Sequence, residues 1–93
     1  MSMAAFDVAA VRAQFPALNR VVADGGNPIY FDNPAGTQVP QRVIDAVSGY
    51  FREMNANSGG AFPTSHVSDA MVVETRRKLA AFLNASRPDE IVI

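Results

Sequence analysis

Two stretches of the chain have apolar positions three and four residues apart, the spacing of one helical face. The first begins at Pro40 and comprises Val43, Ile44, Val47, Tyr50, Phe51 and Met54. The second begins between Thr64 and Ser68 and comprises Met71, Val72, Thr75, Leu79, Phe82 and Leu83. We predict two long amphipathic helices. Ser65 or Ser68 is expected to cap the second helix, and Asn84 to end it in a left-handed conformation.

A shorter helix is predicted near the N-terminus. Asp7 is a suitable N-cap, and the helix would run through Val8 and Val11 until Pro16 ends it. Phe6, before the cap, and Val11 have the spacing of a hydrophobic staple.

Two short apolar runs are predicted to be β-strands. Ile29 to Phe31 follows a loop rich in turn-forming residues (23–28), and Glu90 to Ile93 follows a Ser-Arg-Pro-Asp turn. The expected fold class is therefore α+β, with three helices and short strands. Residues 1–27 would form an N-terminal helix and loop, and residues 28–93 a strand, two helices and the start of another strand.

The predicted strands imply more protein than this chain contains. A strand that is apolar on both faces needs neighbours on each edge and layers above and below it. Two short strands form at best a marginal sheet. We therefore expect residues 1–93 to be the N-terminal segment of a larger α/β fold.

Composition excludes several classes of function. The chain has 93 residues, 48% of them hydrophobic and 18% charged, and a net charge of -1, so it lacks the basic surface that nucleic acid requires. It has no cysteine and a single histidine, His66, which argues against disulfide, thiolate and zinc sites. No apolar run is long enough to span a membrane. Residues 1–5 do not resemble a secretory signal, so the expected location is cytoplasmic.

The turn from Asp32 to Gly36 is the first candidate site. It allows two interpretations: a tight connection after a strand, or a backbone wall of a ligand pocket. In the second, Ala35 and Gly36 would let a substrate come close because they carry almost no side chain. In the first, Asp32 or Asn33 would bond its own backbone.

The loop after the first long helix is the second candidate site. It contains Asn57-Ser58-Gly59-Gly60, whose amides could form an anion-binding nest. The segment lacks the lysine and spacing of a P-loop, which favours a mobile loop instead. A small-anion site at Gly59 and Gly60 remains an alternative.

The charged residues of the last helix have simpler interpretations. His66 is expected to be a capping or surface residue, because no partner that could orient it as a base lies nearby in the sequence. Arg76, Arg77 and Lys78 are expected on a solvated face with local ion pairs. One such pair is Glu74 with Lys78, four residues later.

The sequence resembles the class V aminotransferases and cysteine desulfurase-like enzymes along nearly its whole length. The resemblance rests on the opening helix at residues 7–16, the Tyr30–Pro40 turn, the helix that carries Arg76, and the stretches Phe82-Leu83-Asn84-Ala85 and Pro88-Asp89-Glu90-Ile91-Val92. In the desulfurase branch a His-Arg-Gly-x-His pattern usually occupies the loop where this chain has Ser58-Gly59-Gly60-Ala61-Phe62, so the chain departs from the family there.

The resemblance implies a pyridoxal-phosphate enzyme of the type I aminotransferase fold, a homodimer acting on an amino-acid substrate. It also implies that the cofactor's main ligands, including the Schiff-base lysine, lie outside residues 1–93 in the parent enzyme, and that Lys78 is not that lysine. This segment would pack on the remainder of the parent and line the substrate side of the active site. Asn33, Ala35, Gly36 and Ser58 are the substrate-binding candidates, with no catalytic or metal residue. The alternative is a self-sufficient small helical module that binds another protein through an apolar stripe.

Overall fold

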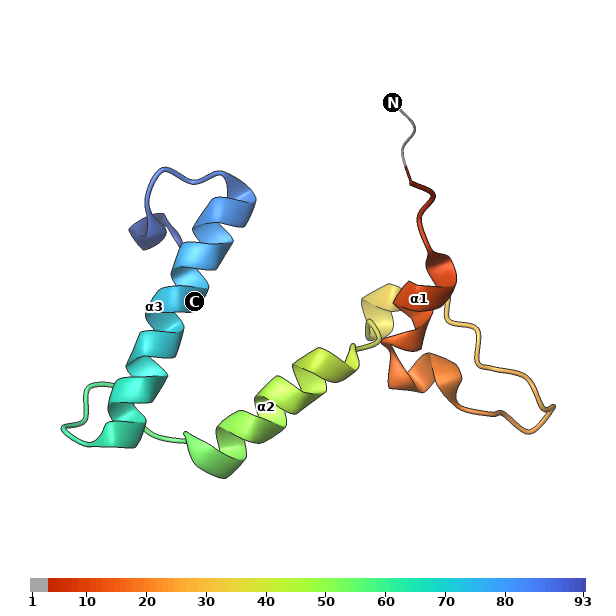
Figure 1. Ribbon diagram of the computed structural model, residues 1–93, viewed down its shortest axis with the longest axis horizontal. Coiled ribbons are helices and arrows are strands. Elements are labelled where there is room, and N and C mark those ends of the chain that lie inside the picture. The colour runs from red at the N-terminus through yellow and green to blue at the C-terminus, as the bar shows by residue number, and fades with distance from the viewer. Residues whose placement is uncertain (1–3) are drawn as a thin grey trace. The chain divides into compact units, whose positions relative to one another are not determined.

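The computed structural model describes residues 4–93 and is helical (Figure 1). Its α-helices are α1 (Val8–Ala13), α2 (Gln41–Glu53) and α3 (Pro63–Leu83), and its short 3-10 helices are η1 (Pro16–Asn19), η2 (Asn33–Ala35) and η3 (Pro88–Glu90). The chain forms two compact units, Met1–Ser48 and Gly49–Ile93, and α2 passes from the first into the second. In the first unit η1 packs against α1, and in the second η3 packs against α3.

The first helix begins as its sequence predicts. The amide of Ala10 donates a hydrogen bond of 2.9 Å to Asp7 Oδ1, which makes Asp7 the N-cap of α1. The helix ends at Ala13, ahead of Pro16, which opens η1. The amide of Gln41, at the start of α2, donates to the carbonyl of Gln14 at 2.8 Å. This bond ties the end of α1 to the beginning of α2.

The long helices occur where they were predicted, with one correction at the start of α3. Ser65 and Ser68 are not caps, because α3 already begins at Pro63 and both serines lie within it. Proline's fixed φ and missing N–H suit the first helical position, which explains the earlier start. At the other end the prediction is confirmed: Asn84 has φ 56° and ψ 37°, and the amide of Ala85 donates to the carbonyl of Ala80 at 2.8 Å.

The two predicted strands are wrong for the isolated chain. Residues 4–93 contain no strand, and Glu90 belongs to η3. Ile91 has the extended angles φ -93° and ψ 122°, but no neighbouring segment completes a ladder with it. A strand is defined by its hydrogen-bonded neighbour, so an apolar run without one stays an extended coil. The short-strand part of the α+β prediction therefore fails, whereas its three helices are confirmed.

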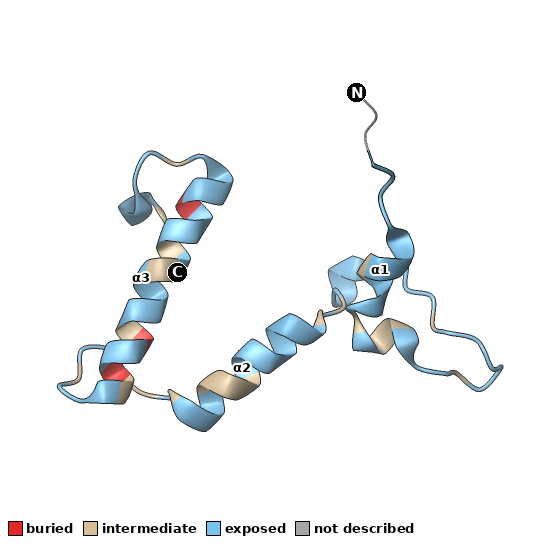
Figure 2. Ribbon diagram, in the orientation of Figure 1, coloured by how far each residue is buried: buried red, intermediate tan, exposed pale blue. Residues whose placement is uncertain are grey.

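The described residues contain almost no hydrophobic core (Figure 2). Ala80 is their one buried apolar residue, and the other two buried residues are Ser65 and Ser68. Large apolar side chains remain in solvent, among them Phe31 at 96% exposure and Val92 at 92%. Burial of apolar surface is the main force that offsets the loss of chain entropy on folding. Little of that force is available within this part of the chain.

None of the helices in residues 4–93 is long and apolar enough to cross a membrane. The interpretation of residues 1–5 as unlike a secretory signal falls partly on residues 1–3, which lie outside the described residues.

Candidate functional site

The predicted Asp32–Gly36 turn contains η2, one turn of 3-10 helix. The amide of Gly36 donates to the carbonyl of Asn33 at 3.0 Å, and Thr37 Oγ1 donates to the same carbonyl at 3.3 Å. Gly36 has φ 153°, which L side chains rarely adopt, while a Cβ there would meet nothing within 4 Å. The backbone angle, not a lack of space, therefore requires glycine at this position.

A hollow of about 410 Å³ adjoins this turn in the unit Met1–Ser48. Its lining comes from α1, η1 and the segment around η2, and consists of Val11, Arg12, Phe15, Leu18, Ile29, Tyr30, Phe31, Asn33, Thr37 and Gln38. Of the predicted site residues, Asn33 lies in this lining, and Ala35 and Gly36 do not. The volume is within the range of small-molecule sites.

The lining suits apolar groups with a few polar contacts. It includes no lysine and no carboxylate. Arg20, outside the lining, donates from Nη2 to the hydroxyl of Tyr30 at 3.3 Å and so orients the one phenol in the hollow. The arrangement can bind, but it contains no pair of groups that could act together as acid and base.

Pyridoxal phosphate does not fit the residues described. The cofactor is held through a Schiff base to a lysine. The chain's one lysine, Lys78, is 70% exposed on α3, and its Nζ lies 4.0 Å from Glu74 Oε1. Lys78 does not line the hollow beside η2, so the described residues do not bring a lysine to that hollow.

The second predicted site lies in the α2–α3 loop, residues 54–62, within the unit Gly49–Ile93. Ser58 is exposed in a turn with Gly59. The loop is attached to α3 by side chains that the sequence patterns did not identify as functional. Ser65 Oγ donates to the carbonyl of Asn57 at 2.6 Å and accepts from the amide of Gly60 at 2.7 Å. The interpretation of this segment as a mobile loop overlooked these bonds.

Two further side chains of α3 hold the same loop. Asp69 Oδ2 accepts a 3.0 Å hydrogen bond from the amide of Gly59. Ser68 Oγ donates to the carbonyl of Met54 at 2.8 Å and lies 3.4 Å from the hydroxyl of Tyr50. The available signal was the three-residue spacing of Ser65 and Ser68, which places both hydroxyls on one helical face beside the loop.

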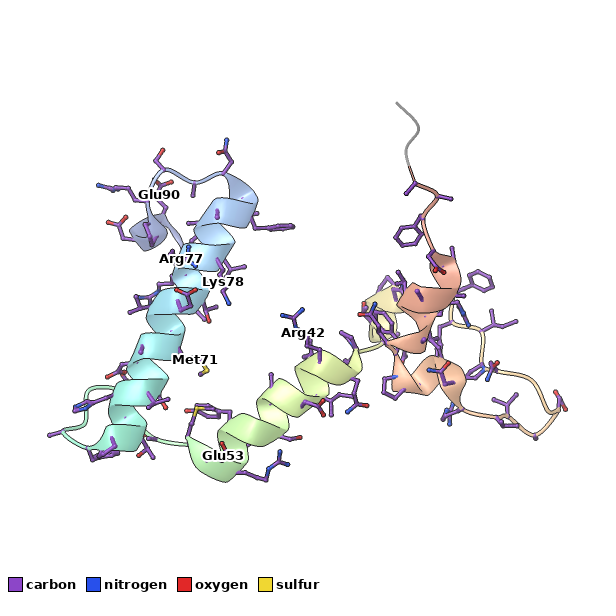
Figure 3. All side chains as sticks on the ribbon, in the orientation of Figure 1. Arg42, Glu53, Met71, Arg77, Lys78 and Glu90 are labelled. Carbon is purple, nitrogen blue, oxygen red and sulfur yellow. The ribbon has the colours of Figure 1, made fainter. Side chains whose placement is uncertain are left out.

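Arg77 and Lys78 of the basic run lie on α3 (Figure 3). Both form the expected ion pairs with Glu74, although Arg77, at 2.6 Å, rather than Lys78, at 4.0 Å, is its main partner. Hydrogen bonding to Arg77 lowers the pKa of Glu74, and the same bonds raise the pKa of Arg77. Arg76 is different: it is half-buried, and its Nε has no acceptor within the described part of the chain. His66 lies exposed on α3, as predicted for a surface residue.

No group of three or more histidine, cysteine, aspartate or glutamate residues that could hold a metal ion occurs between residues 4 and 93.

Comparison with known proteins assigns the family. The model of the family described as Aminotransferase class-V matches residues 29–93. Over 87 residues, 92% of this chain, the sequence is 39% identical to a "Probable cysteine desulfurase" of Streptomyces coelicolor and to another of Halobacterium salinarum. It is 38% identical over 89 residues, 94% of this chain, to a "Cysteine desulfurase" of Synechococcus elongatus.

The matched region is a small part of each relative. It covers 21% of the Streptomyces and Halobacterium proteins and 14% of the Synechococcus protein, so the chain spans about a fifth of their length or less. The match nevertheless includes both candidate sites and all of α2 and α3. The chain belongs to the class V aminotransferase family.

Proposed function

We propose that this chain is the N-terminal segment of a pyridoxal-phosphate-dependent enzyme that acts on an amino-acid substrate, with chemistry like that of a cysteine desulfurase. The names of its relatives and the family match support this proposal. The remainder of the parent enzyme would hold the cofactor, which withdraws electrons from the amino-acid carbon when bound. The parent would be a cytoplasmic homodimer, and the segment would lie on the substrate side of its active site.

The observation that carries the proposal is the uncovered apolar surface at the two runs predicted to be strands. Ile29 and Phe31 are 79% and 96% exposed, and Val92 and Ile93 are 92% and 68% exposed. These side chains become buried if the parent supplies the missing neighbours of the sheet. The buried Arg76 Nε also supports the proposal that more protein covers this segment. Buried polar groups almost always have a hydrogen-bond partner, and this nitrogen has none among the described residues.

The alternative of a self-sufficient helical module is not favoured. Such a module needs a core of its own, and Ala80 alone is buried among the apolar residues from 4 to 93. A small-anion site at Gly59 and Gly60 is also disfavoured, because their amides already donate to Asp69 and Ser65.

For substrate binding we propose Asn33, Ala35, Gly36 and Ser58. Asn33 lines the hollow described above, and Gly36 shapes the turn that carries it. Ser58 is exposed on the α2–α3 loop and is free to contact a ligand.

The experiment uses the full-length protein that contains this sequence. Purified protein should show the visible absorbance of bound pyridoxal phosphate, and borohydride should fix the cofactor to a lysine other than Lys78 in peptide mass spectra. Asn33→Ala should raise KM for the amino-acid substrate. Asn55→Ala is the matched control, because Asn55 is exposed in the loop and lies outside the lining of the hollow. Absence of cofactor and adduct would overturn the proposal.

A further inference from the structure

The α2–α3 loop is held against α3 by a buried hydroxyl. Ser65 is 0% exposed, and its Oγ both donates to the carbonyl of Asn57 at 2.6 Å and accepts from the amide of Gly60 at 2.7 Å. A buried polar group that loses its partner costs considerably more than an exposed one. Ser65 therefore fixes the loop at two points on either side of Ser58 and Gly59.

A carboxylate holds the turn between those two points. The amide of Gly59 donates to Asp69 Oδ2 at 3.0 Å, and Gly59 has φ +75°, in the left-handed region that favours glycine. Hydrogen bonds to a charged acceptor are stronger than those between neutral groups. Asp69 thus fixes the residue that directly follows Ser58.

Gly60 is required by close packing rather than by its backbone angle. A Cβ at this position would lie 2.5 Å from Phe62 Cε1 and 2.9 Å from Ser65 Oγ. The glycine pair therefore fits the helix beneath it: Gly59 supplies the turn, and Gly60 allows the loop to approach Ser65. This explains the Ser-Gly-Gly sequence without an anion.

Ser58 lies between two loop residues that are attached to α3. Its neighbours on both sides, Asn57 and Gly59, have backbone groups bound to α3, while the side chain of Ser58 itself is exposed. We propose that Ser65 and Asp69 are positioning residues that hold Ser58 in a fixed place for contact with the substrate. This inference rests on the proposed function, because it assigns a role to a residue of that same site.

The attachment is tested by hydrogen exchange of residues 55–62 in the full-length protein. Asp69→Ala should speed exchange of this segment by about tenfold, the effect of losing one hydrogen bond, and Ser65→Ala, which loses two, should speed it by at least as much. Asp69→Asn keeps an acceptor oxygen and should restore most of the protection. Ser48→Ala and Asp24→Ala are matched controls outside the loop and should leave its exchange unchanged. Unchanged exchange in both test variants would overturn the proposed attachment.

The positioning role is tested by kinetics of the same variants. Asp69→Ala should raise KM for the amino-acid substrate by about tenfold, because the contact is lost when its geometry is lost. In a Ser58→Ala background the same substitution should have almost no further effect, since the two act through one contact. Additive effects would mean that Asp69 acts on structure alone and would overturn the role.

The two proposals fail in different ways. If the full-length protein binds no pyridoxal phosphate, the proposed function fails, and the exchange of residues 55–62 still decides whether Ser65 and Asp69 hold the loop. If cofactor and activity are present but Asp69→Ala leaves KM for the amino-acid substrate unchanged, the proposed function stands and the positioning role is overturned.

Discussion

Arg77 binds Glu74 through two parallel hydrogen bonds, from Nε to Oε2 at 2.8 Å and from Nη2 to Oε1 at 2.6 Å. This two-point geometry matches the fork of the guanidinium to the carboxylate. Both side chains are exposed, at 61% and 47%, so solvent screens the pair and its contribution to stability is small. Its clearest effect is on protonation.

Glu74 should titrate at lower pH than an ordinary glutamate, because the hydrogen bonds from Arg77 lower its pKa. Its pKa is lower in the folded than in the unfolded state. The pair therefore stabilises the fold above the unfolded-state pKa, and this stabilisation is lost as pH falls through the folded-state pKa. A ¹³C NMR titration of the carboxyl should show the shift, and Arg77→Gln should remove most of it. If Lys78→Gln, and not Arg77→Gln, removed most of the shift in the pKa of Glu74, the assignment to Arg77 would be contradicted.

Asp7→Ala should destabilise α1 by about 1 kcal/mol, because the amide of Ala10 loses its capping acceptor. Hydrogen exchange of residues 8–13 should accelerate, while exchange of α3 stays the same. Asp7→Asn, which keeps a capping oxygen, is the control. Equal acceleration in both variants would mean that charge, rather than capping, holds the helix start.

Asn84→Ala should cost about 1 kcal/mol, because alanine tolerates the left-handed angles at this position less well than asparagine. Asn84→Gly should be neutral or stabilising for the same reason. Thermal unfolding of the full-length protein gives the order of the three variants. If the glycine variant were the least stable, a side-chain contact of Asn84 rather than its backbone angle would be responsible.

Gly60→Ala and Gly49→Ala should change stability in opposite directions. A Cβ at Gly60 meets Ser65 Oγ at 2.9 Å, so the substitution should cost at least about 1 kcal/mol. A Cβ at Gly49 meets nothing within 4 Å and lies inside α2, where alanine should add about 0.5–1 kcal/mol. Denaturant unfolding measures both. Two changes of the same sign would contradict the close packing at Gly60.

Phe31→Ser should destabilise the full-length protein by about 2 kcal/mol, although Phe31 is 96% exposed here. The reason is the proposal that the rest of the parent covers this side chain. Asp24→Ser, at an exposed position outside the family match, is the control and should have no effect. A neutral Phe31→Ser would mean that Phe31 also faces solvent in the whole protein.

Local signals in the sequence predicted the helices well. Helix ends depend on residues close by in the sequence, here Asp7, Pro16 and Asn84. Their positions can therefore be predicted without knowing the rest of the fold. Ile29–Phe31 and Ile91–Ile93 are different, because a strand depends on neighbours that come from elsewhere. These runs are exposed and form no strand within this segment, and their burial by the rest of the parent enzyme stays a prediction.

The candidate site was predicted less completely. Asn33 was recognised from its turn and lies in the lining of a hollow, whereas Ala35 and Gly36 do not. Ser65 was noticed only as a possible cap, because serine near a helix start usually has that role. Its actual partners, Asn57 and Gly60, are eight and five residues away, respectively, and no helical period relates them. Only the structure could show that Asp69 reaches Gly59.

All the bonds that attach the α2–α3 loop join residues no more than 18 positions apart. Chain segments of about ten residues close in roughly 10–100 ns, at a modest entropy cost. We therefore expect this loop to take its shape as soon as Asp69 has left the ribosome, ahead of any sheet that later covers the neighbouring apolar runs. The placement of Ser58 would then be among the earliest parts of the molecule to be settled during its synthesis.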